Sequence, residues 1–382
     1  MSGVTDEAEI RRVFRAAFGS ESEAVASAPG RVNIIGEHTD YNGGYVLPTP
    51  IGTLIWVAVG RRKGDRVRIH AHDYRDGYEF ELGKQAYSRE RLWANYPMGV
   101  VDAILRKGLR LGGVDVAIKG DVPQGAGLSS SAALEVSIAR ALSALFKLEV
   151  DPVELAYIGK AAENGFVGIQ SGVMDQFCAS LGVPGRALLI DCRSNEHRLL
   201  LLPPGYALVA VHTGLERKVE STAYNERVAQ CREGVEAIRV AGNPLVRELR
   251  DATPKMLEEA RSRMSEVIYR RCRHVVTENV RVMEAKTSLE AGDAAKLGAL
   301  MWESHRSLRD DYEVSCPELN ALVDAARESG YVLGARLTGA GFGGCTINLL
   351  PEGHLDDFVN EVPRAYRGLT GLEAKVYRVW PK

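Results

Sequence analysis

The sequence has no apolar run near the roughly 18 residues that a membrane span needs. Its first residues carry acids and no apolar core, so we also expect no signal peptide. No charge of one sign dominates, because 48 Lys and Arg stand against 50 Asp and Glu and leave a net charge of −2. We therefore expect neither nucleic acid nor a membrane as a partner.

Cysteine is sparse, with six residues and no Cys-x-x-Cys pair in the chain. Scattered cysteines of this kind predict reduced thiols and a cytoplasmic location, and they argue against a disulfide framework or a zinc site. The remaining composition is that of an ordinary globular protein, with 45% apolar and 26% charged residues. A length of 382 residues allows two domains of ordinary size or one large one.

Three common nucleotide-binding signatures are also missing. No glycine-rich loop ends in Gly-Lys-Ser/Thr, the third glycine of a dinucleotide fingerprint is lacking, and the His-Arg-Asp and Asp-Phe-Gly landmarks of protein kinases do not occur. If the chain binds a nucleotide, it uses another kind of loop.

The stretch from Lys119 to Arg140 offers such a loop. An alternating apolar segment, residues 114–118, predicts a strand, and helical spacing begins after three consecutive serines. Between them lies a turn with two glycines, so the free N–H groups of the helix start would face the loop and form an anion site. A serine-rich helix cap is the simpler reading, but a cap needs one serine. We predict that a phosphate group binds to Gly125, Ala126, Gly127, Leu128, Ser129, Ser130 and Ser131.

A second informative stretch, residues 29–44, gathers charged and polar side chains between two glycine turns. Glu37, His38 and Asp40 could together hydrogen-bond several hydroxyls of one sugar. A solvated turn is the simpler alternative for Asp40. Metal binding is a weaker alternative because no second histidine lies at ligand spacing.

Two further stretches carry residues of note. Asp175 lies among Val173, Met174 and Phe177, and a carboxylate in such surroundings needs a cationic or hydrogen-bonding partner. It could instead be the N-cap of a helix over 176–181. Residues 335–347 place four glycines between two strand-like runs, which predicts a tight hairpin.

Hydrophobic spacing and cap residues predict the main elements. We expect helices over 6–18, 97–109, 151–164, 264–291 and 317–329. We expect strands over 24–28, 53–59, 66–72, 187–190, 198–202, 207–212 and 375–380.

Residues 30–41, Gly-Arg-Val-Asn-Ile-Ile-Gly-Glu-His-Thr-Asp-Tyr, resemble the galactokinase signature without a mismatch. Together with the serine-rich loop and the closing glycine loop, they resemble the small-molecule kinases that include galactokinases and homoserine, mevalonate and phosphomevalonate kinases. The resemblance spans residues of about 20 to 380. It implies a two-lobed α+β fold with the active site between an N-terminal domain, 1–195, and a C-terminal domain, 196–382. It also implies a left-handed βαβ crossover, against the usual rule.

The same resemblance implies roles for individual residues. The loop 125–131 would bind the ATP phosphates, and Ser131 with Glu163 would bind Mg²⁺. Asp175 would accept or orient the proton of the sugar hydroxyl, and Arg31 would keep it ionised. The residues implied in substrate binding are Glu37, His38, Thr39, Asp40, Gly172, Asp175 and Tyr224.

The implied reaction is ATP-dependent phosphorylation of α-D-galactose at its anomeric hydroxyl, the first committed step of galactose catabolism by the Leloir pathway. A kinase for N-acetylgalactosamine or L-arabinose is an alternative, since such enzymes share the first signature. A non-catalytic galactose sensor is another, although sensors resembling this family lose residues of the run that is intact here at 129–133. We expect a cytoplasmic monomer.

Overall fold

The computed structural model describes residues 5–215 and 221–380. The chain forms two compact units, and each draws on several segments. Unit 1 comprises Met1–Gly30, Thr53–Pro123 and Ser129–Leu181, and unit 2 comprises Arg31–Gly52, Gln124–Leu128 and Gly182–Lys382. The division into 1–195 and 196–382 follows chain order and not contacts, so it stays a prediction.

Unit 1 is built on a sheet whose described strands run in the order β1-β3-β6-β4-β5. Strands β3 and β6, and β4 and β5, pair antiparallel, whereas β4 and β6 run parallel. Two of these strands, β1 and β3, continue into residues of unit 2. The strand bounds are β1 Ala24–Asn33, β3 Pro48–Arg61, β4 Arg66–Ala71, β5 Asp76–Glu81 and β6 Val114–Gly120.

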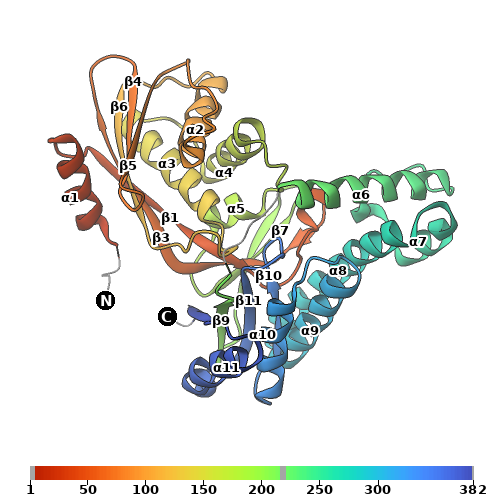
Figure 1. Cartoon of the computed structure of the whole chain (residues 1–382). Helices are drawn as coiled ribbons and strands as arrows, with labels where there is room; N and C mark the ends of the chain where they lie inside the picture. Colours follow the sequence, from red (N-terminus) through yellow and green to blue (C-terminus); the bar gives the residue numbers. More distant parts are fainter. Residues whose placement is uncertain (1–4, 216–220, 381–382) are drawn as a thin grey trace. The chain divides into compact units, whose positions relative to one another are not determined.

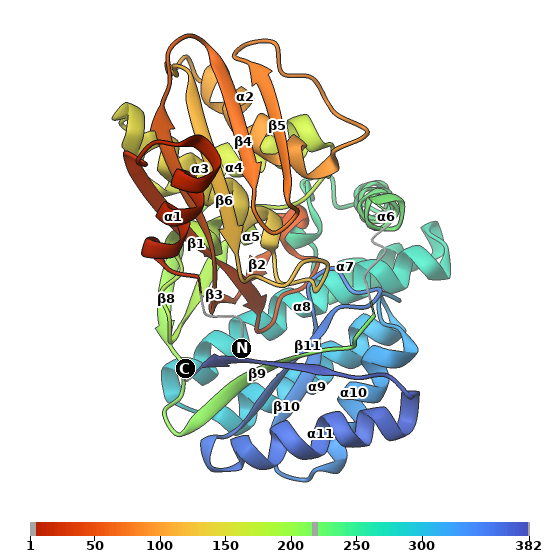
Figure 2. The same ribbon diagram turned by 60° about the vertical axis from the view of Figure 1, so that its left-hand side comes forward.

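Helices cover both faces of this sheet. Helix α1 lies on one face, and α2, α3 and α4 lie on the other (Figures 1 and 2). Ile10 and Phe14 of α1 pack against Ala58 and Ala117 of the sheet. The helix bounds are α1 Glu7–Phe18, α2 Asn95–Arg106, α3 Ser130–Phe146, α4 Pro152–Ala161 and α5 Met174–Leu181.

The helix starts follow from the sequence. Asp6 caps α1 by accepting from the backbone of Glu9 at 2.8 Å, and Gly19 ends the helix in the left-handed region. The predicted order of strand, glycine loop and helix is also confirmed, because β6 leads through the loop into α3. Helix α3 is apolar on most sides and packs against α2, α4 and α5, so it lies buried in the unit.

Unit 2 contains a sheet with described strands in the order β10-β11-β9-β12, all paired antiparallel. Helices α10 and α11 cover one of its faces (Figure 2), where Leu322, Phe358 and Tyr366 meet Val209 and Val211. A smaller sheet joins β2, β7 and β8. The strand bounds are β2 Tyr45–Val46, β7 Arg186–Asp191, β8 His197–Leu201, β9 Tyr206–His212, β10 Gly334–Thr338, β11 Cys345–Pro351 and β12 Lys375–Trp380.

The long helices of unit 2 form a second core around Leu308, Tyr312 and Leu319. The α-helices described in unit 2 have the bounds α6 Ser221–Val240, α7 Pro254–Ala260, α8 Glu266–Ala291, α9 Ala294–Asp310, α10 Pro317–Glu328 and α11 Leu355–Thr370. In the part of the chain that the structure describes, no helix is both long enough and apolar enough to cross a membrane.

Most predicted elements are confirmed within a few residues, and two differ in ways that matter. The helix predicted to run to residue 164 ends as an α-helix at Ala161 and continues as a wider π-turn, Ala162–Val167, which includes Glu163. Such turns often occur at functional sites. Asp175 lies in the first turn of α5 and not at its cap, so the N-cap alternative is wrong. The predicted hairpin is confirmed by the pairing of β10 with β11.

Candidate functional site

Within unit 2, Ala126 and Gly127 of the predicted phosphate loop (residues 125–131) lie close to the closing glycine loop (residues 335–347). A Cβ added at Gly339 would lie 3.0 Å from the Gly127 carbonyl oxygen, and one at Gly344 would lie 3.0 Å from that of Ala126. Both glycines have positive φ, +84° and +85°, which also disfavours a side chain. The glycines predicted from the sequence are therefore needed for the close approach of two backbones.

Arg31 lies against the same loop. Its backbone N–H donates to the Leu128 carbonyl at 3.0 Å, and its guanidinium donates to the Gly127 carbonyl at 2.8 Å. The residue is buried. These bonds position the arginine beside the predicted phosphate-binding residues of unit 2.

Glu37, predicted to bind sugar, is buried and accepts hydrogen bonds from several protein groups. Its Oε1 accepts from the Gly339 backbone at 2.7 Å and from the Thr338 hydroxyl at 3.1 Å, with the buried Arg336 guanidinium at 3.5 Å. Its Oε2 accepts from the Asn33 amide at 3.1 Å. The side chain thus fastens the sugar signature to the closing glycine loop, and a sugar contact by Glu37 stays a prediction.

His38 belongs to an aromatic cluster. Its φ of 64° is unusual for a residue with a side chain, and such strain is common at functional sites. Its Nδ1 lies 2.9 Å from the Tyr41 hydroxyl, and its ring lies 4.7 Å from that of Tyr312 and 5.8 Å from that of Tyr224. Burial, and then the neighbouring Tyr312, raise the pKa of Tyr41, so this hydroxyl stays neutral. The structure thus brings His38 and Tyr224 together.

The two remaining residues of the signature differ in their surroundings. The Thr39 hydroxyl lies 2.9 Å from the Gly36 carbonyl and 2.6 Å from that of Tyr45, so its proton is used by the backbone. Asp40 begins a short 3₁₀ turn and is partly exposed. Any sugar contact of Thr39 would have to use the lone pairs of its oxygen.

In unit 1 the serines of the phosphate loop contact two predicted functional carboxylates. Ser129, in the left-handed region just before α3, donates its hydroxyl to Asp175 Oδ2. Ser131, two residues further, lies with its hydroxyl 3.2 Å from Glu163 Oε1. Gly172 is buried in the segment that leads into α5. The loop, the π-turn and α5 therefore meet at these side chains.

The Glu163 carboxylate and the neighbouring Ser131 hydroxyl would fit a magnesium ion that also binds the phosphates of a nucleotide. Among the described residues no group of three or more His, Cys, Asp or Glu side chains could hold a metal alone. Mg²⁺ is typically bound through one or two carboxylates together with substrate phosphates, and one carboxylate beside one hydroxyl matches that pattern. Burial raises the pKa of Glu163. The hydrogen bond that the Ser171 hydroxyl donates to it, at 2.5 Å, acts to lower that pKa.

Sequence reasoning missed three residues at this site. Ser171 and Gln176 both donate to Glu163, and Gln176 also donates to the buried Glu135. Glu135 had a visible signal, because it is the only carboxylate in the apolar helix α3. Ser171 and Gln176 had none, since no periodicity or motif links them to Glu163, which lies 8 and 13 positions earlier.

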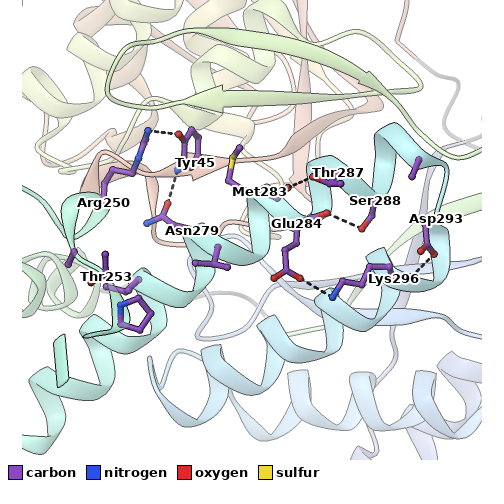
Figure 3. Close-up of a pocket in the computed structure, with 15 residues that line it drawn as sticks. Tyr45, Arg250, Thr253, Asn279, Met283, Glu284, Thr287, Ser288, Asp293 and Lys296 are labelled. Atoms are coloured by element: carbon purple, nitrogen blue, oxygen red, sulfur yellow. Dashed lines mark hydrogen bonds and ion pairs between the residues drawn. The ribbon is translucent and has the colours of Figure 1, made fainter. Parts of the chain in front are cut away.

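Unit 2 also has a groove of about 670 Å³ along α8, drawn in Figure 3. None of the residues predicted for the site lines it. Two of its cations already have partners in the groove: Arg250 lies over the Tyr45 ring at 3.7 Å, and Lys296 pairs with Glu284 at 2.9 Å. The groove therefore offers no group for the predicted chemistry.

Comparison with known proteins agrees with this assembly of motifs. Residues 12–61 match the model for the galactokinase galactose-binding signature. Residues 95–183 match the N-terminal domain of GHMP kinases, and residues 285–368 match their C-terminal domain. The signature match contains Arg31 and Glu37–Asp40, and the N-terminal match contains the phosphate loop and Asp175.

Whole-chain relatives are found at the levels of sequence and structure. A galactokinase from Roseiflexus sp. (strain RS-1) is 43% identical over 372 residues, 97% of this chain and 95% of that protein. The crystal structure of Lactococcus lactis galactokinase complexed with galactose superposes with a TM-score of 0.92 at 33% identity, covering 97% of both chains. Mevalonate kinase from Methanococcus jannaschii, at 19% identity and a TM-score of 0.64 over 93% of this chain and 96% of its own, shares the fold. The chain therefore belongs to the galactokinase family, within the GHMP kinases.

Proposed function

We propose that this protein transfers the γ-phosphoryl group of ATP to the anomeric hydroxyl of α-D-galactose, which gives galactose 1-phosphate and ADP. The observation that carries the proposal is the contact of all three motifs in unit 2: Arg31 and Gly339 lie against Gly127, and Glu37 accepts from Gly339. Membership of the galactokinase family points to the same reaction.

In this mechanism Asp175 assists the attacking hydroxyl. As the sugar O1 forms its bond to the γ-phosphorus and the bond to ADP breaks, the proton of O1 passes to or toward the Asp175 carboxylate. Ser129 donates to Oδ2 and so fixes one face of that carboxylate. We propose that Arg31 keeps Asp175 ionised and offsets the charge that develops on the phosphoryl group.

Backbone and hydroxyl groups of residues 125–131 bind the β- and γ-phosphates in this proposal, because the start of α3 provides free N–H groups. Ser131 and Glu163 are the residues that would hold Mg²⁺. When bound, the ion supplies positive charge that neutralises the phosphates. We also propose a cytoplasmic monomer, and six scattered cysteines without a Cys-x-x-Cys pair are in keeping with a reducing compartment.

Sugar recognition is assigned to Glu37, His38, Thr39, Asp40, Gly172, Asp175 and Tyr224. Glucose differs from galactose in the direction of the 4-hydroxyl alone. A site that hydrogen-bonds the galactose 4-hydroxyl leaves buried groups unpaired when glucose enters, and such losses discriminate by roughly 10⁴-fold or more.

A coupled ADP-release assay with galactose, glucose, N-acetylgalactosamine and L-arabinose tests the proposal. We expect galactose to give the highest kcat/KM and glucose almost none. A higher kcat/KM for N-acetylgalactosamine or L-arabinose would keep the kinase and replace its substrate. Galactose binding without turnover would instead identify a sensor.

A further inference from the structure

Two buried polar side chains beside Glu163 have no part in the mechanism above. Glu135 projects from α3 and Gln176 from α5, and both side chains are completely buried. Burying a carboxyl and an amide costs free energy unless their hydrogen bonds are made. Leucine at either position would fill the space without that cost, so the polar pair calls for an explanation.

The amide of Gln176 joins two carboxyl groups. Its Nε2 lies 3.0 Å from Glu135 Oε2 and 3.0 Å from Glu163 Oε2. An amide NH₂ group has two protons, so each carboxyl receives one. Gln176 is thereby held between the helix that follows the phosphate loop and the π-turn that carries Glu163.

These bonds act on one oxygen of Glu163. Its Oε2 accepts from both Ser171, at 2.5 Å, and Gln176, at 3.0 Å. Its Oε1 contacts Ser131 at 3.2 Å, which is longer than either bond to Oε2. The carboxylate is thus fixed through Oε2, while Oε1 faces the second predicted metal-binding residue and keeps lone pairs for a cation.

The space around the pair is closely fitted. A Cβ added at Gly159 of α4 would lie 3.0 Å from Gln176 Cγ and 3.3 Å from Glu135 Cβ, so any side chain at residue 159 would press on both members of the pair. Among the described residues, Glu135 Oε1 and Gln176 Oε1 have no hydrogen-bond partner. The side chains of Glu135 and Gln176 are therefore joined by one hydrogen bond, from Gln176 Nε2 to Glu135 Oε2.

We infer that Glu135 and Gln176 are positioning residues, which orient the Glu163 carboxylate so that Oε1 is presented to the magnesium ion of the nucleotide complex. This inference rests on the proposed function, because it assumes that Glu163 is a ligand of that ion. Outer partners of metal ligands typically change metal affinity by about 10–100-fold when they are removed.

The test compares two substitutions at residue 135 by calorimetric titration of ADP in the presence of Mg²⁺ and in the presence of EDTA. The ratio of the two ADP affinities is the metal gain, which needs no turnover. Glu135→Leu removes the acceptor for Gln176 and should lower the metal gain about 10-fold or more. Glu135→Gln keeps an acceptor oxygen in place and should retain the gain within about threefold.

Gln176→Leu removes the hydrogen bonds to both Glu135 and Glu163, so its metal gain should fall as it does in Glu135→Leu. The control is Ser137→Ala on α3, which removes a buried hydroxyl bonded to the Ile55 carbonyl at 2.9 Å and should leave the metal gain unchanged. Circular dichroism and thermal unfolding of each variant identify any that fail to fold. ADP affinity in EDTA should stay within about threefold throughout.

The inference is overturned if Glu135→Leu and Gln176→Leu retain the full metal gain, or if Glu135→Gln loses as much as Glu135→Leu. A wild-type protein that shows the metal gain but does not phosphorylate galactose would refute the proposed function and leave the positioning role intact. A folded wild-type protein without any metal gain would refute the metal-binding assignment on which the inference depends.

Discussion

Two completely buried glutamates, Glu135 in unit 1 and Glu278 in unit 2, have opposite electrostatic surroundings. Burial raises the pKa of Glu135 well above its ordinary value, and the nearby Glu163 charge raises it further. Burial also acts to raise the pKa of Glu278, but Arg281, His274 and Arg336 outweigh it and lower the pKa to about 2.

A similar difference in partners separates Glu278 from Glu163, the predicted metal ligand next to Glu135. Glu278 accepts from Arg281 at 2.7 Å, from Ser304 at 2.7 Å and from the Gly36 backbone at 2.9 Å, so its charge is neutralised within the protein. Around Glu163, the partners among the described residues are hydroxyl and amide groups, which leave its negative charge available to a bound cation. We therefore expect substitutions of the predicted functional carboxyls in unit 1 to change activity and those of Glu278 to change stability.

The largest effect that this comparison predicts is at Asp175. Asp175→Ala should lower kcat by about 10²–10⁴-fold, the usual contribution of a general base, and leave the fold intact. Steady-state kinetics with galactose and thermal unfolding of the same sample measure both properties. A variant that keeps a third of its turnover, or that loses stability with normal kcat, would contradict the assignment.

In unit 2 the expected loss is one of stability. Glu278→Leu leaves Arg281, whose side chain is 12% exposed, without its partner and the Gly36 N–H without an acceptor, so the free energy of unfolding should fall by about 3–5 kcal/mol. Glu284→Leu, on the same helix, is the matched control. Glu284 pairs with Lys296 at the surface, where such pairs contribute about 0–1 kcal/mol. Urea unfolding of both variants measures the difference, and equal losses would break the comparison.

A buried histidine of unit 2 should make the fold sensitive to acid. Burial, followed by the charge of Arg336, lowers the pKa of His305 from 6.5 to about 3, and its Nδ1 accepts from the Leu337 backbone at 3.3 Å. Between pH 6.5 and about 3, His305 binds a proton in the unfolded chain but not in the folded chain. Stability should therefore fall as the pH drops from 6.5 towards 3, by on the order of 3–5 kcal/mol in all.

His305→Asn is the matched variant for that prediction. The amide oxygen can accept from Leu337 but does not titrate, so this part of the pH dependence should disappear. Urea unfolding of wild type and variant across the acidic range gives both curves, and parallel curves would show that His305 does not contribute.

Next in size is the effect of Glu163→Gln. Removing an anionic oxygen weakens a site for a hard cation and leaves the sugar pocket unchanged, so the Mg²⁺ requirement should rise by about 10-fold or more. Magnesium titrations at saturating galactose, together with the galactose KM at saturating magnesium, separate the two effects. An unchanged magnesium titration, or a larger change in KM, would count against Glu163 as a ligand.

The sequence predicted most of the fold, because its signals are local. Asp6 and Gly19 mark the ends of α1, and the glycines at 339 and 344 mark a hairpin with close backbone approach. The exception is the π-turn after Ala161, where helical spacing continues although the hydrogen-bond pattern changes. Spacing of apolar residues does not distinguish an α-turn from a π-turn.

The site was predictable where a motif is contiguous and not where partners are remote. The three serines indicated a phosphate loop, but the bonds from Ser129 to Asp175 and from Ser131 to Glu163 join residues 46 and 32 positions apart. Glu37 was read as a sugar ligand from its neighbours in sequence, whereas its contacts with Thr338 and Gly339 depend on the folding of the whole of unit 2.

The smallest effect, and the one that sharpens the comparison most, is expected from Glu135→Gln beside Glu278→Gln. The folded pKa of Glu135 is raised above 4.5, so the folded chain keeps a proton that the unfolded chain releases as the pH rises. The contribution of Glu135 to the stability of the wild type is therefore lost as the pH rises. An amide does not titrate. The free energy of unfolding of Glu135→Gln should therefore lie about 1 kcal/mol or less below that of wild type at low pH, and the difference should shrink or reverse as the pH increases.

Glu278→Gln should behave in the opposite way. The folded pKa of Glu278 lies near 2, so its contribution is complete above 4.5 and is lost as the pH falls. The deficit of Glu278→Gln should thus be largest at neutral pH and shrink in acid. Urea unfolding of both variants between about pH 2 and pH 8 should give slopes of opposite sign relative to wild type, below about pH 4.5 for Glu278→Gln and above it for Glu135→Gln. Slopes of the same sign would mean that burial, and not the partner, decides the charge of a glutamate in this protein.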